Sequence, residues 1–343
     1  MNLLYWLDPW EPSPTVVIVM LTAAILFARG AHKARVSMRR RISFWFGLGA
    51  LYVVLHTRLD YFFEHEFFMH RTQHLVLHHL GPFFIALSYP GAALRAGIPF
   101  RWRQRFVRPT LAARPVRAIL DVLMHPVVAV ALFVGLIYFW LLSPIHFVAM
   151  LDWRLYRVMN WSMAIDGLMF WWLVLDPRPA PPARLSPGRR VLVVIAAIPP
   201  QIVLGAFIFF SSRELYPVYS ICGRAFTWLS PMRDQQIGGL LLWIPGSMMS
   251  VIGAVFALRN WMRLSARARL RTRHAGPPAP APRGPSSLTS NVVDTSRAQL
   301  ITSSDGALAN TSRRRFLQAE RIQTCRMPSS SCSSEIGSKP NAP

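Results

Sequence analysis

The sequence predicts an all-α membrane protein: a polytopic bundle of about seven transmembrane helices, with the N-terminus outside and the C-terminus in the cytoplasm. Three observations predict it. Of the 343 residues, 52% are hydrophobic and only 15% are charged, whereas soluble domains usually carry about 25% charged residues. Apolar runs long enough to cross a bilayer core of about 30 Å recur along the chain. Basic residues cluster in alternate connections between these runs.

The apolar runs define the predicted spans in order. The first has no basic segment or cleavage site before it, so we expect a retained signal anchor. The second is short, the third carries a row of histidines, and the sixth contains Pro199-Pro200, which should break its helix. The spans are residues 14–31, 42–56, 62–88, 126–148, 155–175, 191–211 and 236–261.

Basic residues fix the predicted orientation. They gather in the first, third and fifth connections and after the last span, within residues 29–41, 95–117, 178–190 and 263–273. The other connections carry few. Because Lys and Arg accumulate on the cytoplasmic side, this alternation predicts the orientation and also explains the net charge of +23. The charge therefore does not indicate nucleic-acid binding, and the lipid bilayer is the expected surrounding.

Two parts of the chain differ in composition. Residues 1–263 form the predicted transmembrane domain. Residues 264–343 are first basic, then rich in Pro, Ser and Thr with few aromatic residues, which predicts a disordered cytoplasmic tail. The three cysteines, Cys222, Cys325 and Cys332, have neither the spacing of a zinc site nor that of a disulfide framework.

A row of polar residues in the third span suggests the function. Glu66, His70, His74 and His78 succeed one another at steps of four, so on a helix they form one stripe, with Gln73 beside it. Ionisable groups inside the hydrocarbon core of a membrane are costly unless they pair, bind a ligand or line a water-filled cavity. His70 and His74 can reach one metal ion, and imidazole suits copper, zinc, iron and nickel. The alternative is polar side chains that join neighbouring helices.

Three further polar residues are candidates for supporting roles. Asp166 lies near the centre of the fifth span and needs a partner, such as a histidine of the third span. Asp234 and Gln235 precede the seventh span, where an acid suits the dipole of its own helix. His79 lies off the stripe and His146 lies near the outer end of the fourth span, so both are interpreted as structural.

Three motifs together resemble one family. They are Met69-His70-Arg71-Thr72-Gln73-His74 with Gly81-Pro82 after it, then Gly167-Leu-Met-Phe-Trp-Trp172, then Asp234-Gln235-Gln236-Ile-Gly238-Gly239. This combination is similar to the CtaG-type membrane proteins associated with cytochrome c oxidase assembly. The resemblance implies a non-enzymatic assembly factor in the bacterial inner membrane, with oxidase subunits as partners. It also implies copper as the metal handled, with haem the less favoured cofactor.

The chain departs from the family pattern in two places. Leu142 stands where a Trp-His-x-Pro motif would place its histidine. Tyr156, Met159 and Asn160 stand where further His and Glu-His positions are expected. The second half of a histidine cluster is therefore missing from the sequence pattern.

Two other functions remain as alternatives. A small-solute or ion transporter would use the polar stripe and the Pro199-Pro200 break to line a path. A membrane di-iron hydroxylase would need more ligands, and the remaining histidines form no second motif of this kind.

Overall fold

The computed structural model describes Tyr5 and residues 8–274, and every regular element among them is helical. Most of the elements are α-helices, and η1 and η2 are single π-turns. The elements are α2 (Pro14–Lys33), α3 (Met38–His56), α4 (Leu59–His65), α5 (Phe67–Leu75), η1 (Val76–Leu80), α6 (Gly81–Ser88), α7 (Gly91–Gly97), α8 (Phe100–Trp102), η2 (Arg103–Val107), α9 (Arg108–Ala112), α10 (Arg114–Leu123), α11 (Pro126–Leu141), α12 (Ser143–Leu151), α13 (Trp153–Val174), α14 (Pro187–Phe210), α15 (Val218–Ile221) and α16 (Pro231–His274). The predicted all-α class is confirmed for the described residues.

Several of these helices are long and apolar enough to cross a membrane. Within the described residues, α2, α14 and α16 qualify as single helices. Two bent pairs also qualify when each pair is taken as one span: α3 with α4, and α10 with α11. The structure therefore provides three to five candidate spans by length and composition.

The third predicted span is not one continuous α-helix. Glu66 is extended, with φ −140° and ψ 129°, and separates α4 from α5. Beyond α5 the chain makes the π-turn η1 before continuing as α6. A π-turn adds residues to a helical turn and changes the register of the residues beyond it. The single stripe expected from Glu66 to His78 is therefore wrong.

Three other predicted spans also differ from the observed helices. The fourth breaks at Leu142, whose extended backbone separates α11 from α12. The sixth does not break, because α14 runs through Pro199 and Pro200. This continuity removes one of the two features on which the transporter interpretation depended.

The seventh predicted span lies inside α16, which continues past residue 263 to His274, so the first residues of the expected tail are helical. Residues 275–343, the rest of that tail, lie outside the described residues.

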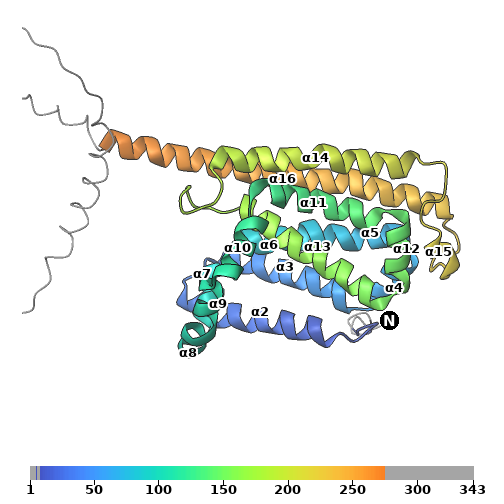
Figure 1. Ribbon diagram of the computed structural model, residues 1–343, viewed down its shortest axis with the longest axis horizontal. Helices are drawn as coiled ribbons and strands as arrows, with labels where there is room; N and C mark the ends of the chain where they lie inside the picture. The colour runs from blue at the N-terminus through green and yellow to red at the C-terminus, as the bar shows by residue number, and fades with distance from the viewer. Residues whose placement is uncertain (1–4, 6–7, 275–343) are drawn as a thin grey trace, which may run out of the picture. The chain divides into compact units, whose positions relative to one another are not determined.

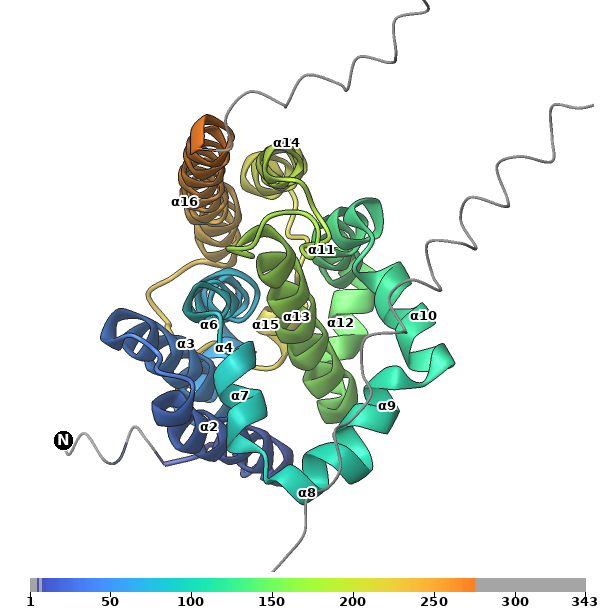
Figure 2. The ribbon, with the colours of Figure 1, turned by 90° about the vertical axis from the view of Figure 1, so that its left-hand side faces the viewer.

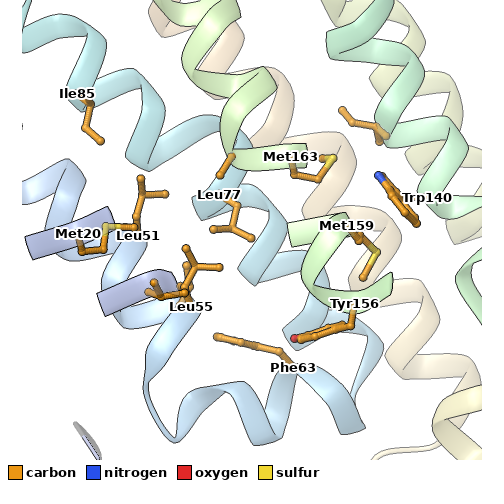
Figure 3. Packing of buried hydrophobic residues seen from close by; sticks show 14 of the residues in the cluster. Met20, Leu51, Leu55, Phe63, Leu77, Ile85, Trp140, Tyr156, Met159 and Met163 are labelled. Atoms are coloured by element: carbon orange, nitrogen blue, oxygen red, sulfur yellow. The ribbon is translucent and has the colours of Figure 1, made fainter. Parts of the chain in front are cut away.

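The helices pack around α13. It contacts α6, α11, α12, α14 and η1, and Figure 2 shows α13 lying among α6, α11, α12 and α14. Apolar side chains fill the space between α13 and the third predicted span: Leu77 of η1, Met159 and Met163 are all buried, as the close view shows (Figure 3). Long helices α14 and α16 run side by side (Figure 1).

Glycines allow one pair of helices to touch through their backbones. Gly97 of α7 lies against the carbonyl of Leu26 in α2, and Gly30 of α2 lies against the carbonyl of Ala93 in α7. Neither glycine leaves room for a Cβ atom. This contact holds α7 at one end of the helices, on the side where the basic connections and the C-terminal half of α16 also lie (Figure 1).

Candidate functional site

His70 and His74 of α5 lie against each other inside the helices. Their ring centroids are 4.4 Å apart, and both side chains are buried. Steps of four residues place them on one face of α5, so the two histidines lie side by side as their spacing predicted. A metal ion could bind either ring only through a nitrogen whose lone pair is not already used in a hydrogen bond.

His146, for which the sequence predicts no role beyond a structural one, lies next to this pair. Its ring centroid is 5.2 Å from that of His70. The break at Leu142 ends α11 and starts α12, and His146 on α12 is completely buried. The sequence places Leu142 where the family pattern has a histidine, and His146, four residues later, brings an imidazole to the cluster. We use the name histidine cluster for His70, His74 and His146.

The hydrogen bonds of His146 fix its tautomer. Its Nδ1 lies 3.0 Å from the carbonyl oxygen of Trp140 and must donate to it. Its Nε2 therefore accepts from the hydroxyl of Tyr219, at 3.0 Å. Burial raises the pKa of Tyr219 well above its usual range, so this hydroxyl keeps its proton. The lone pair of His146 is thus occupied.

The lone pair of His74 is also occupied. Arg71 Nη2 lies 3.3 Å from His74 Nδ1, and a guanidinium can only donate. Nδ1 is therefore the acceptor, and Nε2 carries the proton that faces Asn160 Oδ1 at 3.3 Å. His74 could bind a metal through Nδ1 only if Arg71 moved away.

His70 is the free imidazole of the cluster. Its side chain is completely buried, and neither ring nitrogen has a hydrogen-bond partner. A buried polar atom without a partner costs free energy, so His70 is the position at which a ligand would be most favourable. Within residues 8–274, however, no three His, Cys, Asp or Glu side chains are arranged to hold a metal ion.

Gln73, the supporting residue beside the pair, belongs to a separate network. Its amide nitrogen donates to the carbonyl of Val54 at 2.9 Å and to Asp60 Oδ1 at 3.1 Å. Tyr156 donates to the same carboxylate at 2.8 Å and lies 3.1 Å from Gln73 Oε1. These bonds tie α3, α4, α5 and α13 together next to the histidine cluster.

His78 and Asp166 form a second buried pair. His78 Nε2 lies 3.0 Å from Asp166 Oδ2, as the sequence predicted when it assigned Asp166 a histidine partner in the third span. The ring of His78 stacks on Phe133, with centroids 4.0 Å apart. Because η1 turns it toward α13, His78 does not complete the histidine cluster.

Glu66 and Asp234 meet at the start of α5. Both carboxylates pair with Arg224, and Glu66 also accepts from the backbone N–H of Phe226 at 2.8 Å. Asp234 lies in the first turn of its own helix α16, as expected, and it also accepts from the N–H groups at the start of α5. Both residues are structural here.

Gln235 holds the connection between α14 and α16. Its side-chain oxygen accepts from the N–H of Leu215 at 2.7 Å. Its nitrogen donates to the carbonyls of Ile208 and Arg213. This connection carries Tyr219, so Gln235 supports the cluster indirectly.

Sequence reasoning missed several residues that shape the site. Except for Arg71, which contacts His74 three residues away, each contributes through a contact between distant segments: His146, Arg71, Asn160, Asp60, Tyr156, Tyr219 and Arg224. Only Arg71 gave a usable signal. An arginine in the middle of an otherwise apolar and histidine-bearing span needs an explanation.

The fold and this site define a helical membrane protein with buried imidazoles among apolar side chains. The family model of cytochrome c oxidase caa3 assembly factors (Caa3_CtaG) matches residues 19–264, which include every residue of the cluster. The chain belongs to this family, which is named for assembly and not for a catalysed reaction. No curated protein and no solved structure is significantly similar to the chain.

Proposed function

We propose that this protein assists the assembly of cytochrome c oxidase in the bacterial inner membrane, in contact with oxidase subunits and without catalysing a reaction of its own. The family match over residues 19–264 carries this proposal. The buried histidine cluster adds a chemical feature that a purely structural membrane anchor would not need.

We propose seven membrane crossings, with the N-terminus outside. The crossings are α2, α3 with α4, the segment from α5 to α6, α11, α13, α14 and α16. Support comes from the positions of the basic stretches: the connection between α2 and α3, helices α7 to α10 and the C-terminal half of α16 lie at one end of the helices (Figure 1). A shared basic end is what the cytoplasmic side requires.

Copper is the proposed cargo, held transiently as Cu(I) and passed on to a haem–copper oxidase subunit. The proposal depends on His70, whose two ring nitrogens have no partner. His74 is the second ligand in this proposal, after Arg71 releases its Nδ1. A site with few ligands suits transfer, because a closed four-ligand site would retain the ion. Haem is the less favoured cofactor in this proposal.

To test the function, the gene is deleted and the deletion strain is then complemented with the wild type, with His70→Gln or with His65→Gln. His65 is the matched control: it lies on α4, bonded to the carbonyl of Tyr61, outside the cluster. We expect the deletion and His70→Gln to lower assembled oxidase, measured as haem a absorbance and cytochrome c oxidation in membranes. His65→Gln should restore both. Normal oxidase in the deletion strain would refute the assembly role.

A separate measurement tests copper. The purified wild type should bind one Cu(I), measured by competition with a chromophoric chelator, and His70→Gln should bind about tenfold more weakly or worse, since one ligand is lost. If wild type and His70→Gln bind Cu(I) equally, the cargo proposal fails while the assembly role stands.

A further inference from the structure

Arg71 is a buried cation without an anion. It lies on α5 with 4% of its surface exposed. Its one hydrogen bond within residues 8–274 is the bond to His74 Nδ1, and its Nε has no partner. No carboxylate of the described residues forms an ion pair with it; Glu66 and Asp234, at the start of the same helix, pair with Arg224. An uncompensated buried charge is strongly unfavourable.

Arg190 is a comparison case, because the chain itself supplies hydrogen-bond acceptors for its guanidinium. Arg190 is also fully buried. Its nitrogens donate to the backbone carbonyls of Asp176, Arg178 and Leu185. Among the described residues Arg71 donates to no backbone carbonyl; its guanidinium carbon lies 5.4 Å from the ring centroid of Phe67. A guanidinium keeps its charge in proteins and offers five N–H donors, and the buried Nε of Arg71 has no acceptor.

A cavity of about 20 Å³ lies beside Arg71. Its polar lining consists of Arg71, His74, His78 and His79, and its apolar lining comes from α5, α11, α13 and α16. His79 is buried and its Nδ1 has no hydrogen-bond partner. The volume suffices for a water-sized species. The wall thus contains a fixed positive charge and a second available nitrogen, and no carboxylate.

We propose that this cavity binds one monoatomic anion, chloride under cellular conditions. Arg71 supplies the charge and N–H donors, and a neutral His79 with its proton on Nδ1 supplies a further donor. The anion compensates the buried guanidinium, and charge-assisted hydrogen bonds of this kind are the strong ones. The proposal needs neither copper nor an oxidase partner, so its failure would leave the proposed function untouched.

The direct test is equilibrium binding of radioactive chloride to the purified full-length protein in detergent, with gluconate as the replacing anion. We expect one saturable chloride per chain, displaced by bromide and not by gluconate, which is too large for the cavity. Arg71→Met should weaken chloride binding about tenfold or more, because a charge-assisted bond is lost. Arg178→Met removes one charge from a partly exposed residue outside the cavity and should leave binding unchanged.

Thermal unfolding provides a second measurement. Chloride should raise the unfolding temperature of the wild type and not that of Arg71→Met, since only a ligand bound to the folded state stabilises it. His79→Phe keeps a ring in place and should weaken chloride binding even if Arg71→Met does not fold. Absence of saturable chloride binding in the wild type, or equal binding in Arg71→Met, would overturn the proposal and leave the cavity to water.

Discussion

The carboxylate of Asp234, at the start of α16, accepts hydrogen bonds from the backbone N–H of Phe67, at the start of α5. The two residues are 167 positions apart, and the distance is 3.0 Å. The same carboxylate accepts from the N–H of Phe68 at 2.8 Å. Asp234 therefore caps a helix that is not its own, in the way an N-cap side chain satisfies the free donors of a first turn. This bond fixes the start of the helix that carries His70 and His74.

We predict that Asp234→Ala destabilises the protein by about 3 kcal/mol, because it removes a buried partner of Arg224 and leaves the first turn of α5 uncapped. Denaturant titration in mixed micelles would measure this loss of unfolding free energy. The matched control is Asp121→Ala, since Asp121 pairs with Arg184 at an exposed site and such pairs contribute about 0 to 1 kcal/mol. Equal losses in the two variants would contradict the capping role.

The pair of His78 and Asp166 should show energetic coupling. Single changes, His78→Phe or Asp166→Leu, leave a buried polar group without its partner, whereas the double change removes both. We expect the double variant to be more stable than the sum of the single losses predicts, by about 1 to 3 kcal/mol. A double-mutant cycle on unfolding free energies measures this coupling. A value near zero would mean that the 3.0 Å contact contributes nothing specific.

The contact between α2 and α7 should depend on glycine. In Gly97→Ala the new Cβ would overlap the carbonyl of Leu26, so the helices must separate, at a cost of about 1 to 3 kcal/mol. Gly49→Ala is the control, because nothing lies within 4 Å of its Cβ position and alanine favours a helix by about 1 kcal/mol. Unfolding temperatures should therefore fall for Gly97→Ala and hold or rise for Gly49→Ala.

Arg71 should oppose copper binding. Its guanidinium occupies the Nδ1 lone pair of His74 and repels a cation placed at the cluster. We predict that Arg71→Met binds Cu(I) about tenfold more tightly than the wild type, measured by chelator competition, while Arg178→Met matches the wild type. Weaker Cu(I) binding by Arg71→Met would show that His74 does not act through Nδ1.

Local patterns predicted the helices and one histidine pair, because both depend on residues close in sequence. Apolar runs placed most helix ends within a few residues, and a step of four placed His70 beside His74. The pairing of His78 with Asp166 was predicted because a buried carboxylate needs a partner. These predictions depend only on apolar run length, on helix geometry and on the cost of a buried charge, none of which requires knowledge of the tertiary structure.

The remaining contacts depend on backbone breaks that the sequence does not announce. Pro144, at the start of α12, is compatible with a helix break at Leu142, but nothing in the local sequence shows that the break brings His146 to the cluster. Pro199 and Pro200 suggest a break that does not occur: α14 continues through both, and the hydroxyl of Tyr138 donates to the carbonyl of Pro200 at 2.7 Å. Such outcomes are decided by neighbouring helices, which a single sequence leaves unspecified.

The π-turn η1 separates two groups of histidines on what would otherwise be one helix. If Val76–Leu80 kept every residue but closed into an ordinary α-helix, every later residue of the segment would rotate by about 100°. His78 would then leave Asp166, and Gly81 would leave the position where it packs on Leu51. The π-turn thus absorbs one residue, so a one-residue deletion there should leave Gly81 and the residues after it facing as they do, whereas a one-residue insertion should turn them away.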